Sequence, residues 1–410
     1  MSRSSVAPGH RILWLLGPAL VAGVAYLDPG NVASNMTAGA EYGYLLVWVV
    51  VAGNTMAWLI QYLSAKLGVV TGKSLPELLG ERIGNRFARR AYWLQAELVA
   101  MATDLAEIIG GAVALNLLFN LPLIWGGIIT GTVSMAVLAV QTRHGPRTFE
   151  RLIIGLLAII AIGFSAGVFI APPEPGGVLG GLVPRFDGAN SVLLAASILG
   201  ATIMPHAIYA HSALARDRWV GRDPSLTTRR LLTATRWDVS IAMVIAGSVN
   251  LCILLLAAAS LQGMAGTDSL EGAYVALEQS MGAVVATLFA VGLLASGLAS
   301  TSVGAYAGAE IMHGLLHVRI PILLRRLVTL IPALVILGSG FEPTQALVLS
   351  QVVLSFGIPF ALIPLVWVTT QAGVLGEYRN RWLTTVAGLT ASVLLVALNV
   401  TLLALVFTGS

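Results

Sequence analysis

The sequence has little charge and almost no cysteine. Only 10% of its 410 residues are charged, against roughly 25% in an ordinary soluble domain, and 57% are hydrophobic. This balance excludes a soluble globular protein and predicts an all-α polytopic membrane protein. The single cysteine, Cys252, excludes both an intramolecular disulfide and a metal site built from several thiolates. We interpret Cys252, which lies in an apolar run, as a small core residue.

Three further features are missing. The stretch GVVTGKS resembles a phosphate-binding loop, but Leu67 stands where that motif requires glycine. The net charge of +4 comes without an interleaved basic and aromatic patch, so no nucleic-acid partner is expected. The first apolar run leads into a polar break and not into a small-residue cleavage site, so we expect no cleaved signal peptide.

Long apolar runs dominate what is present. A bilayer core requires about 20 apolar residues per helix. On that scale the sequence predicts eleven membrane spans, at residues 12–42, 44–68, 91–117, 120–141, 151–171, 191–216, 237–262, 284–314, 321–340, 344–370 and 382–407.

The basic residues predict the orientation of these spans. With the N-terminus in the cytoplasm, Arg185 is the one residue among the 23 Lys and Arg that falls outside. Cytoplasmic connections of membrane proteins are enriched in Lys and Arg. The distribution therefore predicts an N-terminus inside and a C-terminus outside, and short tails suit a bacterial inner membrane.

Two of the spans are interrupted by helix breakers. The first reads VAGVAYLDPGNVASN around Pro29 and Gly30, and the sixth reads ASILGATIMPHAIYAHSAL around Pro205. Corresponding breaks in spans 1 and 6 divide the chain into two halves, 12–171 and 191–370, which are inserted in opposite orientations because five spans is an odd number. A single transmembrane domain with this inverted repeat, plus an extra helix at 382–407, is typical of a secondary transporter with a site near the midplane.

The breaks place oxygen and sulfur in the membrane. Proline has no N–H, so Pro205 should leave the carbonyl of Ala201 free, and Pro29 that of Ala25. Asp28 adds a carboxylate that is costly at this depth unless it has a partner. Asn31 offers an amide oxygen and Met204 a thioether, which shifts a hard oxygen site towards manganese, iron, cobalt or cadmium.

Each of these residues also fits a structural role. Asp28 suits the N-cap of the half-helix after Pro29. Asn31 suits turn chemistry, and a buried Met204 suits simple packing.

Acidic and basic residues inside other spans suggest a proton route. Glu97, Asp104 and Glu107 lie on one side of the third span by helical spacing. Candidate partners are His211 and Arg218, which form a stripe with Met204 at seven-residue spacing, and two arginines early in the ninth span, Arg325 and Arg326. Such a network can relay protons or can lock the scaffold as structural ion pairs. His206 fits either a role in the gate or proton route or simple packing, and Asn250 fits either the pathway or a helix-to-helix hydrogen bond.

DPGN in span 1 together with MPH in span 6 resembles the Nramp family of proton-coupled divalent metal transporters, over essentially the whole chain. The resemblance implies the LeuT-type fold, with metal bound by Asp28, Asn31, Met204 and the Ala201 carbonyl. It also implies that Gln351, in SQVVLSFGIPFAL, joins these ligands in an occluded state, and that Asp28 and the span 3 acids carry protons. The sequence departs from the family pattern at YAGAEIMHG, where a glutamine is expected after the glycine.

We therefore predict a secondary active transporter that imports Mn²⁺ or Fe²⁺ with protons by alternating access. It should not be an enzyme, should need no resident cofactor, and should act as a monomer. The alternatives are a sodium-coupled amino-acid or amine transporter of the same fold, or a divalent-cation channel.

Overall fold

The computed structural model describes residues 17–144, 146–219, 226–264, 266–267, 269–318 and 320–408. Four of the basic residues used to predict the orientation, Arg3, Arg11, Arg222 and Arg319, lie outside these ranges, as does the start of the first predicted span.

Helices follow the predicted spans closely. The first span is α2 (Pro18–Ala25) and α3 (Pro29–Tyr42), and the sixth is α10 (Gly188–Ile203) and α11 (Pro205–Trp219). The other spans are α4 (Val47–Thr71), α6 (Arg86–Phe119), α7 (Leu123–His144), α8 (Pro146–Ile170), α12 (Thr228–Ser260), α14 (Ala283–Leu316), α15 (Ile322–Ser339), α16 (Pro343–Thr370) and α18 (Trp382–Thr408). Within the described ranges, eight helices are long and apolar enough to cross a membrane. The all-α membrane fold and both helix breaks are confirmed.

Short helices that were not predicted occupy the connections. They are α5 (Leu75–Arg82), α9 (Pro175–Gly181), α13 (Leu270–Met281), α17 (Ala372–Leu375) and the 3₁₀ turn η1 (Gly376–Tyr378). A capping box starts α5, in which Ser74 and Glu77 each accept a hydrogen bond from the backbone N–H of the other. α12 begins earlier than predicted because the Thr227 side chain accepts from the N–H of Arg230.

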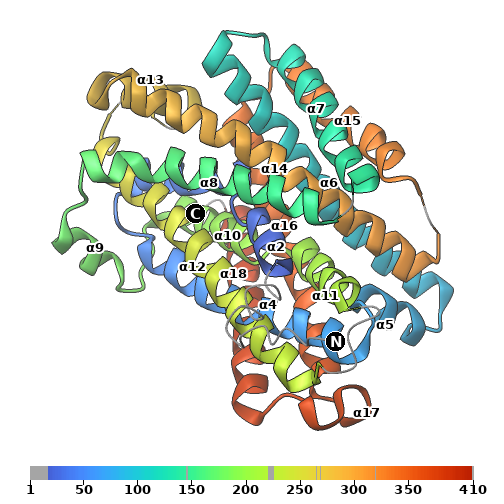
Figure 1. Cartoon of the computed structure of the whole chain (residues 1–410). Coiled ribbons are helices and arrows are strands. Elements are labelled where there is room, and N and C mark those ends of the chain that lie inside the picture. Colours follow the sequence, from blue (N-terminus) through green and yellow to red (C-terminus); the bar gives the residue numbers. More distant parts are fainter. Residues whose placement is uncertain are drawn as a thin grey trace, which may run out of the picture.

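The interrupted helices lie inside the bundle, and α2 is central in Figure 1. For the α10–α11 segment, 94% of its apolar window is buried inside the protein, against 33% for α8 and α18. α3 packs against α10, α12 and α16, and α6 packs against α14, α15 and α16. α7 and α15 lie side by side at one edge of the molecule (Figure 1). The breaks are therefore surrounded by protein, as irregular backbone at membrane depth requires.

Candidate metal site

The first break closes with a tightened turn. The N–H groups of Tyr26, Leu27 and Asp28 donate to the carbonyls three residues earlier, and the last of these bonds ends on Ala25 at 3.2 Å. The prediction of a free Ala25 carbonyl was therefore wrong. Such 3₁₀-type bonds satisfy carbonyls that an α-helix would leave open at its end.

Asp28 is fully buried at the N-terminus of α3. Its Oδ1 accepts from the N–H of Asn31 at 2.8 Å, and its Oδ2 accepts from Nε2 of Gln351 at 3.0 Å. No Lys, Arg or His of the described ranges forms an ion pair with it. The carboxylate thus caps its helix, yet none of the described Lys, Arg or His residues pairs with its negative charge.

Polar side chains donate hydrogen bonds to the backbone carbonyls of this break. The carbonyl of Tyr26 accepts from Nδ2 of Asn31 and from Nδ2 of Asn250, and that of Leu27 accepts from Oγ of Ser296. Asn31 Oδ1 accepts from Asn35 Nδ2 at 2.6 Å. Asn250 therefore forms a helix-to-helix hydrogen bond to the break, while the amide oxygen of Asn31 keeps a second lone pair.

The second break is centred on Met204, whose φ of 26° is rare for a residue with a side chain. Backbone conformations of this kind cost about 1–3 kcal/mol and persist only where the surrounding structure imposes them. No donor of the described residues bonds to the carbonyl of Ala201. The break thus leaves one backbone carbonyl without a donor from the described residues, three positions before a residue with a thioether side chain.

Gln351 of α16 lies between the two breaks. A Cβ at Gly30 would be 1.8 Å from Gln351 Nε2, and a Cβ at Gly200 would be 2.0 Å from the Gln351 carbonyl oxygen. Only glycine permits both approaches. The Gln351 Oε1 atom is buried without a hydrogen-bond partner, as is Oδ1 of Asn35. Buried oxygens without a partner among the described residues are unusual in proteins, and both of these atoms are chemically able to bind a cation.

The structure therefore joins Asp28, Asn31 and Gln351 by hydrogen bonds or close contact at one break and places the Met204 break against the same glutamine. All five predicted ligands, including Ala201, are 0% exposed. One carboxylate with amide and carbonyl oxygens and a thioether is a mixed hard and soft set. The described residues contain no group of three or more His, Cys, Asp or Glu that could hold a metal.

A cavity of about 320 Å³ opens between α3, α10 and α16, with Glu41 and Glu342 in its lining. One turn along α3, Ser34 and Ser197 share a hydrogen bond of 2.6 Å between their hydroxyl groups. Ser197 also contacts the carbonyl of Val348 at 3.1 Å. These contacts join the three helices and separate the cavity from the buried ligands.

A second polar cluster, which we call the α6–α15 network, consists of Glu97, Asp104, Glu107, Arg325 and Arg326. Arg325 lies 2.8 Å from Glu97 and 3.1 Å from Asp104, and Arg326 lies 2.8 Å from Asp104. Arg326 Nη1 is also 3.1 Å from Glu107 Oε2, but without hydrogen-bond geometry. Three carboxylates thus face two guanidinium groups, and Glu107 is the least bonded of the three.

The two histidines of α11 face different helices. His206 Nδ1 lies 3.1 Å from the hydroxyl of Thr103 on α6, whereas His211 Nδ1 lies 2.7 Å from Gln61 Oε1 on α4. The predicted stripe of Met204, His211 and Arg218 therefore does not bring His211 to the acids. His206 is the histidine beside α6, and Arg218 is half-buried near the end of α11.

The network borders the first break. Pro29 packs so closely against α6 that a Cβ at Gly110 would be 2.0 Å from its side chain. Gly110 is one helical turn from Glu107. A Cβ at Gly297 of α14 would meet both the Glu107 carbonyl and Pro29, at 2.9 and 3.5 Å. Asp28 and Glu107 are therefore neighbours across this helix crossing.

Asp238 of α12 was not predicted from the sequence. It is 3% exposed, and its carboxylate accepts from the N–H groups of Gly17 at 3.1 Å and Ala19 at 2.9 Å, at the start of α2. A carboxylate at a helix N-terminus satisfies free N–H groups and complements the helix dipole. The available signal was an acidic residue, Asp238, at the point where the basic start of α12 gives way to its apolar part.

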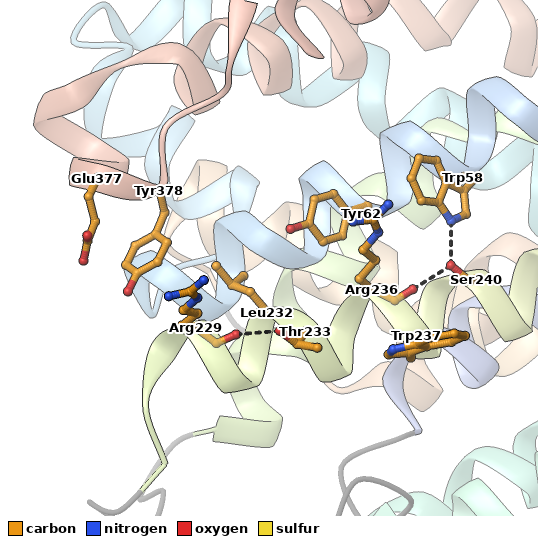
Figure 2. A pocket seen from close by; sticks show the side chains of 10 residues that line it. All are labelled: Trp58, Tyr62, Arg229, Leu232, Thr233, Arg236, Trp237, Ser240, Glu377 and Tyr378. Carbon is orange, nitrogen blue, oxygen red and sulfur yellow. Dashed lines mark hydrogen bonds between the residues drawn. The ribbon is translucent and has the colours of Figure 1, made fainter. Parts of the chain in front are cut away.

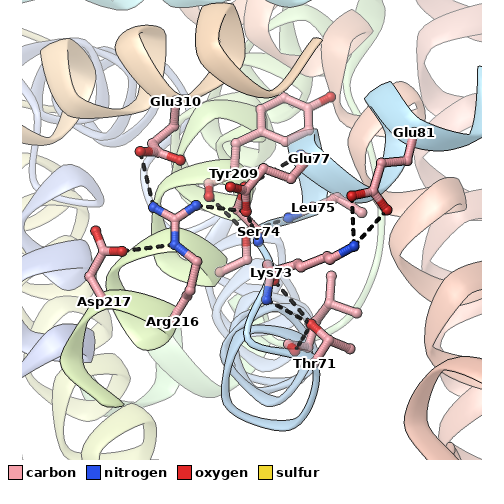
Figure 3. A network of polar contacts seen from close by, with 12 residues as sticks. Thr71, Lys73, Ser74, Leu75, Glu77, Glu81, Tyr209, Arg216, Asp217 and Glu310 are labelled. Carbon is pink, nitrogen blue, oxygen red and sulfur yellow. Dashed lines mark hydrogen bonds and ion pairs between the residues drawn. The ribbon is translucent and has the colours of Figure 1, made fainter. Parts of the chain in front are cut away.

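Arg216 ties α11 to its neighbours (Figure 3). Its guanidinium lies 2.7 Å from Glu77 of α5, 2.8 Å from Asp217 and 3.1 Å from Glu310 of α14. Burial raises the pKa of Glu77, but hydrogen bonds from Ser74 and Arg216 outweigh it and hold that pKa below its ordinary value. The contacts fasten the end of a broken helix to two other elements.

Comparison with known proteins agrees with this geometry. The family model described as natural resistance-associated macrophage protein-like, Nramp, matches residues 19–405. A divalent metal cation transporter MntH of Mycobacterium tuberculosis is 62% identical over 396 residues, covering 97% of this chain and 92% of that protein. The MntH of Bacillus subtilis is 47% identical over 395 residues, with coverage of 96% and 92%.

Solved structures show the same architecture. A manganese transporter of Eremococcus coleocola matches with a TM-score of 0.86 at 31% identity, covering 99% of this chain and 90% of that one. MhsT in complex with L-phenylalanine matches with a TM-score of 0.66 at 12% identity, covering 95% and 97%. The second likeness concerns the fold alone and agrees with the LeuT-type arrangement expected from the sequence.

Proposed function

The chain belongs to the Nramp family, a family of membrane transporters of divalent metal cations and not of enzymes, and we propose that it imports Mn²⁺ or Fe²⁺ together with protons. The metal would bind Asp28, Asn31, Met204, the Ala201 carbonyl and Gln351 as transported substrate. We further propose that the protein needs no resident cofactor and acts as a monomer.

One observation carries the choice of metal. A fully buried methionine occupies the second helix break, and that break packs against Gln351, which donates a hydrogen bond to Asp28. The positive φ of Met204 is a strained conformation that the surrounding structure imposes. Ca²⁺ prefers six to eight oxygen ligands, whereas softer divalent transition metals accept a thioether. The manganese transporter among the solved structures, and the MntH proteins among the relatives, support the same choice.

The proton route rests on the neighbouring carboxylates. Asp28 forms no ion pair within the described part of the chain, and the α6–α15 network holds one more carboxylate than guanidinium groups. Glu107 is closest to the break and least bonded. We propose that Asp28 releases its proton when metal binds and that Glu107, with Glu97, Asp104, His206 and the two arginines, passes it towards the cytoplasm. His211 stays a candidate with less support, because its ring contacts Gln61 of α4. Arg218 stays a candidate on its sequence spacing alone.

The orientation follows from the basic residues, with the N-terminus in the cytoplasm and the C-terminus outside, in a bacterial inner membrane. The cavity near Glu41 then faces outward, and the Asp238 cap and the Arg216 contacts lie on the cytoplasmic side. In alternating access, the serine contacts would open to admit metal, and the α2 cap would open to release it.

The two alternatives have less support. A sodium-coupled amino-acid transporter shares the fold, but the likeness to MhsT at 12% identity carries no argument about substrate. A channel would repeat identical residues around a pore. Here the ligands are unlike one another and come from a single chain.

The proposal is tested by Mn²⁺ uptake into proteoliposomes containing the full chain. We expect Asp28→Ala to abolish uptake and Met204→Ala to keep part of it while losing discrimination against Ca²⁺. Asp187→Ala, which removes an exposed aspartate at the start of α10, is the control and should transport normally. Full and selective uptake by both site variants would show that the metal binds elsewhere.

A pH dye inside the same vesicles tests the proton route. Glu107→Gln should reduce proton entry, or change its pH dependence, while Mn²⁺ still binds. Unchanged proton entry at every pH would remove Glu107 from the route.

A further inference from the structure

A cavity of about 690 Å³ opens between α4, α12 and the segment after α17 (Figure 2). It lies at the end of the bundle that we propose to be cytoplasmic, and none of its lining residues is a proposed metal ligand. Two arginines of α12, Arg229 and Arg236, line it together with aromatic side chains, Trp58, Tyr62, Trp237 and Tyr378. Figure 2 shows both arginines extending from α12 towards the space beside α4.

The two guanidinium groups have no anionic partner in the described part of the chain. Neither forms an ion pair, although Glu377 also lines the cavity. Arg236 lies over the ring of Trp58 at 5.9 Å from its centre. Seven residues separate the arginines, which places them on one face of α12. The cavity therefore presents two fixed positive charges with free hydrogen-bond donors.

An apolar groove of about 470 Å³ continues from this cavity between the same two helices. Trp58 and Ser240 line both spaces, and Trp58 Nε1 donates to the Ser240 hydroxyl at 2.9 Å where they meet. Beyond that point the lining is mainly apolar and includes Val51, Met243, Val244 and Leu251. Polar and charged residues thus lie at one end and hydrocarbon at the other.

We propose that this cavity and groove bind an anionic phospholipid of the cytoplasmic leaflet. Its phosphate would contact Arg229 and Arg236, and one acyl chain would lie along the groove past Val244. Basic pockets between transmembrane helices on the cytoplasmic side suit anionic headgroups, and Trp and Tyr favour the membrane interface. The order of charge, aromatic belt and apolar groove matches the order of headgroup, glycerol and acyl chain.

The continuous groove favours a lipid over a soluble phosphate compound, which would fill the charged end alone. The cavity and groove are also open at the surface of the helix bundle, since the side chains of Trp237 and Val244 are 59% and 68% exposed. The N-terminal segment of this chain is a poor occupant, because it carries Arg3 and Arg11 and no acidic residue before Asp28. Like charges would repel it from the two arginines.

The test is native mass spectrometry of the full chain in detergent with equimolar phosphatidylglycerol and phosphatidylcholine. Arg229→Gln with Arg236→Gln should weaken phosphatidylglycerol binding about 30-fold, from the usual contribution of two arginines near an anionic surface. Arg86→Gln with Arg90→Gln removes two exposed arginines spaced along the start of α6, outside this cavity, and should leave binding unchanged.

A second variant tests the groove with both arginines present. Val244→Trp should reduce phosphatidylglycerol binding, whereas Val328→Trp, at a similarly exposed position of α15, should not. Inorganic phosphate at millimolar concentration should not displace the lipid. Wild-type phosphatidylglycerol binding by the double arginine variant would overturn the proposal. So would displacement by phosphate combined with normal binding by Val244→Trp, which would identify a site for a soluble anion.

Discussion

Two groups of buried carboxylates lie side by side in this protein and are treated in opposite ways. Asp28 is held by a backbone N–H and an amide, with no cation among its described neighbours. Asp104, equally buried, is bonded to two arginines at 3.1 and 2.8 Å. Both carboxylates are 0% exposed, so the difference lies in their partners and not in their burial.

This difference distinguishes a residue that binds an ion from solution, Asp28, from a network that stabilises the helix packing, the α6–α15 network. A buried charge is stable only with a partner, so the α6–α15 network carries its own cations and stays neutral apart from one carboxylate. Asp28 instead has room for a cation or a proton that comes from solution. An arginine paired with Asp28 would compete with the metal for this carboxylate.

The largest expected effect is the loss of protein stability on substitution of Asp104 in the α6–α15 network. Asp104→Asn would remove the shared partner of Arg325 and Arg326 and leave buried charge uncompensated. Breaking a buried ion pair costs about 3–5 kcal/mol. Thermal unfolding in detergent should show a clear loss of stability, and a melting temperature equal to that of wild type would mean that the network does not hold the scaffold.

Asp28→Asn should behave in the opposite way. Asparagine caps a helix as well as aspartate does, and Gln351 can turn its unpaired Oε1 towards the new amide, so the change in unfolding free energy should stay within about 1 kcal/mol. Mn²⁺ uptake should nevertheless fall at least about 100-fold, since even indirect partners of metal ligands contribute 10–100-fold. If Asp28→Asn lost stability but kept Mn²⁺ uptake, Asp28 would be a structural residue and not a metal ligand.

Gly30→Ala tests whether the close approach of the Gln351 side chain to the first break is needed for transport. The added methyl group would collide with the Gln351 side chain, and overpacking of this kind costs about 1–3 kcal/mol. Uptake should drop, and shortening the glutamine with Gln351→Ala in the same chain should restore stability. Gly155→Ala, at a helical glycine with open space around it, is the control. If the double variant were as unstable as Gly30→Ala alone, the collision with Gln351 would not be the cause of the lost stability.

The smallest expected effect concerns the α2 cap. Asp238→Asn would lose negative charge at the N-terminus of α2, which lowers helix stability by about 0.5–1 kcal/mol. A cysteine placed at Val24 of α2 should then react faster with a cytoplasmic thiol reagent in Cys252→Ser background. Equal labelling rates with and without the substitution would show that Asp238 does not hold α2 closed.

Much of the fold was predictable because its causes are local. Span length follows from hydropathy, and the breaks follow from Pro29 and Pro205, whose missing N–H acts wherever the residue stands. The choice of Asp28, Asn31, Met204 and Ala201 used the same local argument. Gln351 came from family resemblance only, since a glutamine in an apolar helix does not reveal which break it faces.

Features set by tertiary packing were not predictable. The carbonyl of Ala25 is satisfied because the end of α2 tightens, which the sequence around Pro29 does not specify. Gln61 is the partner of His211 because of how α4 packs against α11. The Asp238 cap joins residues more than two hundred positions apart. The capping box at Ser74 and Glu77, by contrast, is a local signal that the sequence alone shows.

The central claim is that Asp28 and Met204 together select the metal, and direct titration of the purified full chain tests it. Wild type should bind Mn²⁺ and Cd²⁺ in the presence of excess Ca²⁺. Asp28→Asn should bind none of the three, and Met204→Ala should bind Mn²⁺ weakly and lose it to Ca²⁺. Wild-type preference for Mn²⁺ over Ca²⁺ in Met204→Ala would contradict the account.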